Sequence, residues 1–195
     1  GIYYLMENIA LTLTQASNIS VIVSIAPIFT GILAHFFLEG EKMKKSIVLG
    51  FVCAMAGICL ITFQKGETVE LNPLGDFLGV AAAAIWGVYS ICSRKIAGFG
   101  YDTIITTRRT FFYGILFMLC ALPFMDFHLS LSALLKPVNL GNIIYLGVGA
   151  SAICFVTWNY AVKSLGATRA SVYIYGIPVV TILMSIPLLH EVITF

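Results

Sequence analysis

The segment Pro137–Val162, PVNLGNIIYLGVGASAICFVTWNYAV, contains no Asp, Glu, Lys or Arg. A helix of about 20 apolar residues is long enough to cross a hydrocarbon layer about 30 Å thick. Strands of a membrane barrel would be shorter and would alternate in polarity. Other uncharged runs have the same character, and they are Ser46–Gln64, Phe77–Ser93, Thr110–Met125 and Ala170–His190. The sequence therefore predicts an all-α membrane protein.

The composition excludes several other classes of protein. Of the 195 residues, 59% are hydrophobic and 10% are charged, whereas about 25% are charged in an average soluble domain. Such a chain is too apolar to be a soluble domain or a disordered one. Its net charge of +2 is too small for a nucleic-acid-binding surface. The expected surroundings are a lipid bilayer.

Turn-forming residues separate seven expected transmembrane helices. These helices cover 1–13, 17–38, 46–63, 75–93, 103–125, 141–162 and 169–189. Charge predicts their orientation, because Lys and Arg concentrate in cytoplasmic connections. Nine of the 11 Lys and Arg residues lie in or beside the connections 39–45, 94–102 and 163–169. We expect these three to face the cytoplasm of a bacterial inner membrane, and 14–18, 64–74 and 126–140 to face out.

An internal repeat relates the second and seventh of these helices. Asn8–Thr30 aligns with Asn159–Thr181 at a constant offset of 151 residues. The identical pairs are Asn8/Asn159, Ala10/Ala161, Ala16/Ala167, Ser20/Ser171, Val21/Val172, Pro27/Pro178 and Thr30/Thr181. The two helices lie an odd number of crossings apart, so they run in opposite directions. Inverted repeats are typical of secondary transporters, which bind substrate near the midplane and alternate access between the two sides.

Three stretches resemble one transporter family. Leu74–Ala97 is similar to the opening helix of an EamA-type repeat, and Ser17–Lys42, with Pro27 and Gly40-Glu41, is similar to the fourth helix of a preceding copy. Asn142–Thr194 is similar to the third and fourth helices, including the elements WNYA, LGATRAS, IP and HE. The sequence thus resembles EamA-type members of the drug/metabolite transporter superfamily.

This resemblance implies a bundle of ten helices in two inverted five-helix repeats. The chain would then be an internal part that lacks the first two helices and the tenth. Residues 1–64 would hold the last three helices of the first repeat, 65–76 an external linker, and 77–195 the first four helices of the second. The implied function is a secondary transporter of small metabolites, most simply an exporter of amino acids or related amphipathic compounds. The alternatives are a non-transporting sensor or scaffold and, less favoured, an intramembrane enzyme.

Polar residues deep in the spans are the first candidates for the substrate site. Glu7 lies about 10–15 Å from the expected outer surface at 1.5 Å per residue. A carboxylate there is costly unless it faces the bundle or water, so Glu7 is a candidate for proton coupling or for binding an ammonium group. The repeat mates Asn8 and Asn159 are candidates for hydrogen bonds to substrate. For all three residues the alternative is a bond that links neighbouring helices.

Aromatic residues are the second group of candidates. Trp86 and Tyr89 share a helix face at a spacing of three residues. Trp158, Tyr173 and Tyr175 lie in segments that the resemblance places around the cavity. Aromatic walls suit amphipathic substrates, whereas Tyr and Trp also form belts at membrane interfaces. For Tyr3, Tyr4, Tyr101 and Tyr145 we expect the belt.

Prolines and small residues predict features of the backbone. Pro27 and Pro178, the latter beside Gly176, predict paired kinks that serve gating or simply packing. Residues Gly75, Gly79, Ala83 and Gly87, and likewise Gly50, Ala54 and Gly57, form stripes that predict close helix packing.

The remaining motifs predict structure rather than chemistry. Glu41 and Glu191 should cap helices or order loops. Arg108 and Arg109 should orient the chain at the cytoplasmic surface, or else contact an anion at the cavity mouth. Histidines and cysteines form no catalytic or metal-binding motif in the sequence, so we expect no enzymatic activity, no metal and no cofactor.

Overall fold

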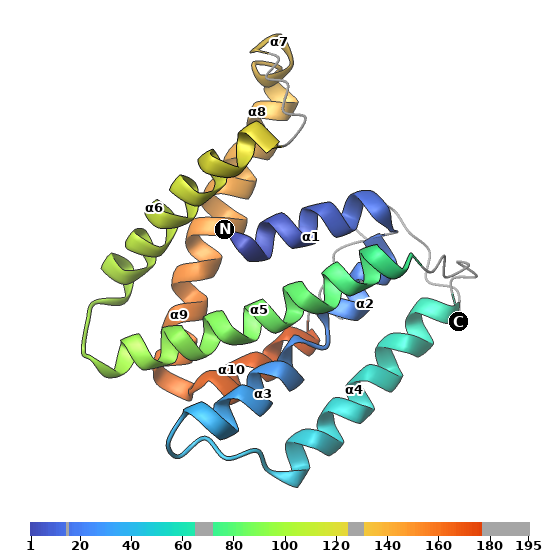
Figure 1. The fold of residues 1–195 in the computed structure, drawn as a ribbon, viewed down its shortest axis with the longest axis vertical. Coiled ribbons are helices and arrows are strands. Elements are labelled where there is room, and N and C mark those ends of the chain that lie inside the picture. The colour runs from blue at the N-terminus through green and yellow to red at the C-terminus, as the bar shows by residue number, and fades with distance from the viewer. Residues whose placement is uncertain (15, 65–71, 125–130, 177–195) are drawn as a thin grey trace.

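The computed structural model describes residues 1–14, 16–64, 72–124 and 131–176, and every regular element in these residues is a helix (Figure 1). The elements are α1 (Ile2–Leu13), α2 (Ala16–Val23), α3 (Ala26–Phe37), α4 (Lys45–Gln64), α5 (Pro73–Gly98), α6 (Thr103–Ala121), η1 (Leu122–Phe124), α7 (Leu131–Leu134), α8 (Pro137–Ile144), η2 (Tyr145–Ile153), α9 (Cys154–Leu165), α10 (Ala167–Val172) and η3 (Tyr173–Gly176). The predicted helical class is confirmed.

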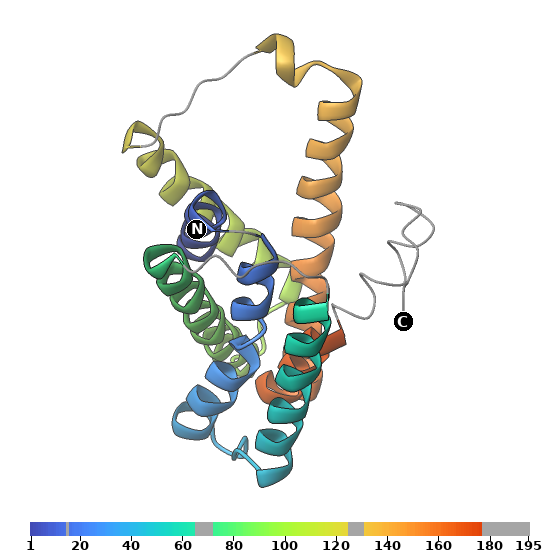
Figure 2. The same ribbon diagram turned by 90° about the vertical axis from the view of Figure 1, so that its right-hand side faces the viewer.

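Three of the described helices are long and apolar enough to cross a membrane. They are Pro73–Gly98 with 26 residues, Thr103–Ala121 with 19, and Pro137–Leu165 with 29. The last of these comprises α8, the π-helical segment η2 and α9, which form one continuous column (Figure 2). Val21–Phe37 and Lys45–Ile58 are shorter apolar helices. Seven spans and a ten-helix architecture stay predictions.

Helix α5 is the central element, and α1, α2, α3 and α9 all pack against it (Figure 1). Pro73 occupies its first turn, where a missing N–H costs nothing. The Asn72 side chain caps this end by accepting hydrogen bonds from the N–H groups of Leu74 and Gly75 at 3.2 and 3.1 Å. Asp76 in the first turn and Lys95 in the last complement the helix dipole.

The small-residue stripe on α5 is a packing face, as predicted. A Cβ added at Gly75 would lie 3.1 Å from Thr14 Cγ2, and one at Gly87 would lie 3.1 Å from the backbone N of Thr30. For the α4 stripe close packing stays a prediction, because among the described residues no neighbouring element comes within 4 Å of a Cβ built at Gly50 or Gly57.

Contacts at the two ends of α5 place the ends of two of its neighbours. The start of α5 meets the end of α1, since Asn72 Nδ2 donates to the Leu13 carbonyl at 2.9 Å. The end of α5 meets the end of α9, since Arg94 Nη1 donates to the Lys163 carbonyl at 2.6 Å. The C-terminal ends of α1 and α9 therefore lie at opposite ends of α5, and the inverted repeat itself stays a prediction.

The expected helix 17–38 is interrupted rather than continuous. Helix α2 ends at Val23, residues 24 and 25 form a turn, and α3 begins at Ala26 with Pro27 in its first turn. Proline has no N–H to donate to the preceding turn of helix, so the interruption falls where the sequence predicts a kink. A role for this break in gating stays a prediction.

Candidate functional site

An aromatic cluster lies around the middle of α5. Trp86 is about 20 Å from either end of this helix, at 1.5 Å per residue. Its ring centroid is 5.2 Å from that of Trp158 on α9 and 5.6 Å from that of Tyr89. The rings of Tyr3 and Phe155 lie 5.1 and 5.6 Å away. Three predicted aromatic residues, Trp86, Tyr89 and Trp158, are thus brought together.

Glu7 borders this aromatic cluster. Its side chain is half-buried, and its Oε1 accepts a hydrogen bond from the Tyr3 hydroxyl at 2.8 Å. Tyr3 in turn packs on Trp86 and, with ring centroids 5.4 Å apart, on Tyr4. The expected interfacial belt is therefore wrong for Tyr3 and Tyr4, which pack inside the bundle, whereas Tyr101 and Tyr145 are exposed.

An apolar cavity of about 450 Å³ lies beside the aromatic cluster, between α1, α6 and α9. Tyr4 and Phe155 line it from the side of the cluster, and Phe111 and Met118 line it from α6. Thr110 adds a hydroxyl to this wall. The volume is within the range of small-molecule sites, about 300–1,000 Å³, and such sites combine apolar walls with a few polar groups.

Asn159 joins three helices below the cluster. Its Oδ1 accepts hydrogen bonds from the Tyr89 hydroxyl at 2.9 Å and from the Ser93 hydroxyl. Its Nδ2 donates to the Thr107 hydroxyl of α6 at 2.9 Å. Both functional ends of this buried amide are occupied, so the geometry favours the helix-linking alternative. Its repeat mate Asn8 is exposed, and the structure does not bring the two asparagines together.

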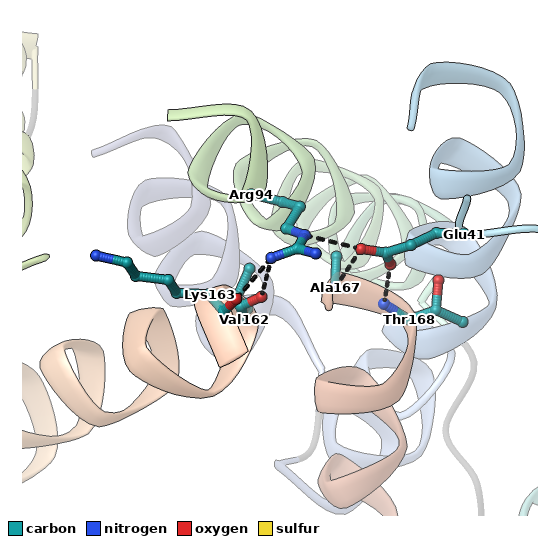
Figure 3. A network of polar contacts seen from close by, with 6 residues as sticks. All are labelled: Glu41, Arg94, Val162, Lys163, Ala167 and Thr168. Atoms are coloured by element: carbon teal, nitrogen blue, oxygen red, sulfur yellow. Dashed lines mark hydrogen bonds and ion pairs between the residues drawn. The ribbon is translucent and has the colours of Figure 1, made fainter. Parts of the chain in front are cut away.

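A second polar network ties α3, α5 and the α9–α10 connection together (Figure 3). Glu41, which follows α3, caps α10: its Oε1 accepts from the N–H of Ala167 at 3.2 Å, and its Oε2 accepts from that of Thr168 at 3.0 Å. Gly166 lies against this carboxylate with φ +91°, and a Cβ there would lie 2.7 Å from Oε1. The predicted capping role of Glu41 is confirmed.

Arg94 completes the second network. Its Nε donates to Glu41 Oε1 at 3.0 Å, and its Nη1 donates to the carbonyls of Val162 and Lys163 at 3.4 and 2.6 Å. One side chain thus neutralises a carboxylate and caps the end of α9 (Figure 3). From the sequence, Arg94 is expected only as one of the basic residues of a cytoplasmic connection, and this capping role is not predicted. A cation at a helix C-terminus is a signal of such a cap.

The other predicted site residues lie elsewhere. Tyr173 is exposed, and Tyr175 is half-buried with its ring 6.4 Å from that of Phe51. Gly176 is the last residue of η3 and is exposed. Pro178 and Glu191 lie outside the described residues. Arg108 and Arg109 are both exposed on the first turns of α6.

Comparison with known proteins decides the family. The model of the EamA-like transporter family matches residues 1–63 and 73–195. The chain belongs to the EamA-like transporter family. The gap in the match, 64–72, overlaps the expected external linker 65–76. The predicted family is thus confirmed.

Three relatives are similar to the chain in sequence, and one crystal structure is similar to it in fold. An uncharacterized transporter of Archaeoglobus fulgidus is 29% identical over 100% of the chain and 67% of its own length. Uncharacterized transporter YyaM of Bacillus subtilis is 28% identical over 91% and 58%. A probable terminal-alkyne amino-acid exporter of Streptantibioticus cattleyicolor is 28% identical over 91% and 57%. The chain therefore spans about three fifths to two thirds of these relatives. One crystal structure, 22% identical, shares the fold with a TM-score of 0.81 over 98% of the chain and 66% of its own.

Proposed function

We propose that this EamA-family protein is a multi-pass secondary transporter of the plasma membrane that exports amino acids or related amphipathic compounds. The aromatic cluster carries the proposal. It lies near the middle of α5 and brings together rings from α1, α5 and α9. In the expected inverted repeat α1 and α9 belong to opposite halves, and alternating access needs a site between such halves. The name of the Streptantibioticus relative supports an amino-acid substrate.

In this proposal each part of the chain has a place in a ten-helix protein. Residues 1–64 belong to the first repeat, 65–76 form an external linker, and 77–195 belong to the second repeat. The aromatic walls hold the apolar side chain of the substrate, and Glu7 holds its ammonium group. The 450 Å³ cavity beside the cluster has room for an amino-acid side chain.

Efflux from intact cells tests the proposal. Cells that express the whole protein are loaded with labelled phenylalanine, leucine, lysine or phenethylamine, and loss of label is followed with and without a protonophore. Faster efflux of one class than from cells with the empty vector supports transport. If the protein leaves the efflux of every compound unchanged and binds a protein partner stably, the sensor or scaffold alternative replaces it.

Glu7 is the proposed proton-coupling group. Glu7→Gln removes the ionisable group but keeps a side chain that can accept from Tyr3. Because the same carboxylate holds the ammonium group, we expect slower efflux in this variant, and the efflux that remains should not depend on the proton gradient. Glu39→Gln is the matched control, because Glu39 is exposed beyond the end of α3. Unchanged gradient dependence in Glu7→Gln would remove Glu7 from the mechanism.

A further inference from the structure

Two buried hydrogen-bond donors in the aromatic cluster have no acceptor. The indole nitrogens of Trp86 and Trp158 are both buried, and neither has a hydrogen-bond partner among the described residues. A buried N–H without a partner is rare in proteins and is costly at membrane depth. Here two such groups lie on rings 5.2 Å apart between centroids, on two different helices.

Several acceptors on residues of the cluster or next to it in sequence already receive hydrogen bonds from other donors. The Oδ1 of Asn159, one position along from Trp158, accepts from Tyr89 and Ser93. The backbone carbonyl of Trp86 accepts from the Ser90 hydroxyl at 3.0 Å. Glu7 Oε1 accepts from Tyr3. The two indole N–H groups are therefore hydrogen-bond donors without an acceptor among the described residues. This lack of acceptors suggests a ligand that supplies them.

The chemistry of indole restricts what this ligand can be. The indole nitrogen donates one hydrogen bond and accepts none, so a cation or a hydroxyl hydrogen cannot satisfy it. A carboxylate offers two oxygens to two donors, and bonds to an ionised acceptor are stronger than neutral ones. We propose that the indole N–H groups of Trp86 and Trp158 bind the carboxylate of the transported compound.

This assignment rests on the proposed function and makes it more specific. The sequence suggested Asn8 and Asn159 for hydrogen bonds to the substrate. The proposal gives this role, toward the carboxylate, to two tryptophans that the sequence suggested as aromatic walls. Glu7 and the indole pair then bind opposite charges of one zwitterion. Selection of amino acids over the corresponding amines follows from the N–H groups and not from the rings.

The experiment separates the N–H groups from the rings. Trp86→Phe and Trp158→Phe keep an aromatic ring and remove the donor. Whole protein in proteoliposomes is assayed for uptake of labelled phenylalanine, with phenylalanine and phenethylamine as competitors that differ only in the carboxylate. We expect each variant to weaken competition by phenylalanine about 10-fold or more, the value of one hydrogen bond to a charged group. Competition by phenethylamine should change less than about threefold.

A control residue in the same cluster lacks a donor. Phe155 contacts Trp86 through its ring alone, so Phe155→Leu should weaken both competitors alike. Gel filtration of each variant in detergent verifies that it is folded. If a phenylalanine variant aggregates, Trp86→Tyr or Trp158→Tyr takes its place. The tyrosine hydroxyl restores a hydrogen-bond donor, so these variants should regain part of the selectivity. Equal losses for both competitors in the tryptophan variants, or no loss, would overturn the assignment while transport itself stands. A wild-type protein that transports no carboxylate-bearing compound overturns the assignment together with the proposed function.

Discussion

The two hairpins that share a repeated sequence contact opposite ends of α5 through different chemistry. At the start of α5, the α1–α2 hairpin is held by the neutral amide of Asn72, which donates to the Leu13 carbonyl. At the other end, the α9–α10 hairpin is held by Glu41 and Arg94, which are joined by an ion pair at 3.0 Å. The two segments with a repeated sequence are thus tied to α5 by different polar contacts.

The polar contacts at the two ends of α5 differ in strength. To separate α9–α10 from α5, charge-assisted hydrogen bonds must break, and these are about twice as strong as neutral ones. To separate α1 from α5 at its polar contact, one neutral bond must break. The Glu41 side chain is 15% exposed and that of Arg94 is 35% exposed, so solvent weakens the pair without removing it. The polar contacts are therefore stronger at the end with the ion pair.

Removal of the Glu41 carboxylate should give the largest loss of stability, and it tests whether the ion-pair end of α5 has the stronger polar contacts. We expect Glu41→Ala to lower the free energy of unfolding by about 3 kcal/mol, because two backbone N–H groups and Arg94 lose their acceptor. Thermal denaturation of the purified protein in detergent measures the loss. Glu41→Gln keeps one acceptor oxygen and should cost about half as much. A fully stable Glu41→Ala protein would mean that the ion-pair end is not the stronger one.

The two repeat-mate asparagines offer the next largest contrast. Asn159→Ala breaks three hydrogen bonds, and interhelical bonds in membrane proteins contribute about 0.6 kcal/mol each and up to about 1.7. We expect a loss of about 2 kcal/mol. Asn8→Ala should cost less than about 0.5 kcal/mol because Asn8 is exposed. The same denaturation assay on both variants decides, and equal losses would contradict the asymmetry.

Substitution of Gly166 tests how closely Glu41 approaches the backbone at the ion-pair end of α5. Gly166→Ala should cost about 2 kcal/mol, since φ is +91° and the new Cβ would meet the Glu41 carboxylate. Gly100→Ala is the matched control: φ there is +79°, and a Cβ would meet nothing within 4 Å. We expect about 1 kcal/mol for this control. If the two substitutions cost the same, the close approach of Glu41 adds nothing.

Asn72 gives the smallest expected effect, at the opposite end. Asn72→Ala should cost about 1.5 kcal/mol, because it removes both the cap of α5 and the bond to Leu13. Asp102→Ala removes a similar cap from α6, where Asp102 accepts from Ile104 and Ile105 at 2.9 and 3.0 Å, and it should cost about 1 kcal/mol. The excess for Asn72 measures the tie to α1, and a cost no larger than that of Asp102→Ala would show that this tie is negligible.

The helices could be predicted from the sequence because apolar runs and turn residues are local signals. The expected range 75–93 lies within α5, and 46–63 lies within α4. Pro27 marks the break between α2 and α3 for an equally local reason, its missing N–H. The expected helix 141–162 begins four residues later than the observed one, which starts at Pro137. Proline is favourable in the first turn of a helix, so it is part of the helix and not of the preceding turn.

The site was less predictable because its contacts join residues far apart in the sequence. Tyr89 and Asn159 are 70 positions apart, and Glu41 and Thr168 are 127 apart. An asparagine in a span has the same sequence signature whether it meets a substrate or a neighbouring helix. The residues near Tyr3 in the sequence predict a place at the interface, whereas the contact with Trp86 cannot be read from them.

The two tryptophans also make the aromatic cluster optically visible. They are the only two in the 195-residue sequence, and they stand side by side at 5.2 Å between ring centroids. Light emitted by tryptophan in this chain therefore comes from the cluster alone, with Tyr3 and Tyr89 close enough to pass their excitation to it. An indole buried without a hydrogen bond emits at short wavelength, and an acceptor that reaches it moves the emission to the red. If the cluster binds the substrate as proposed, the wavelength of this emission would report whether the substrate is bound.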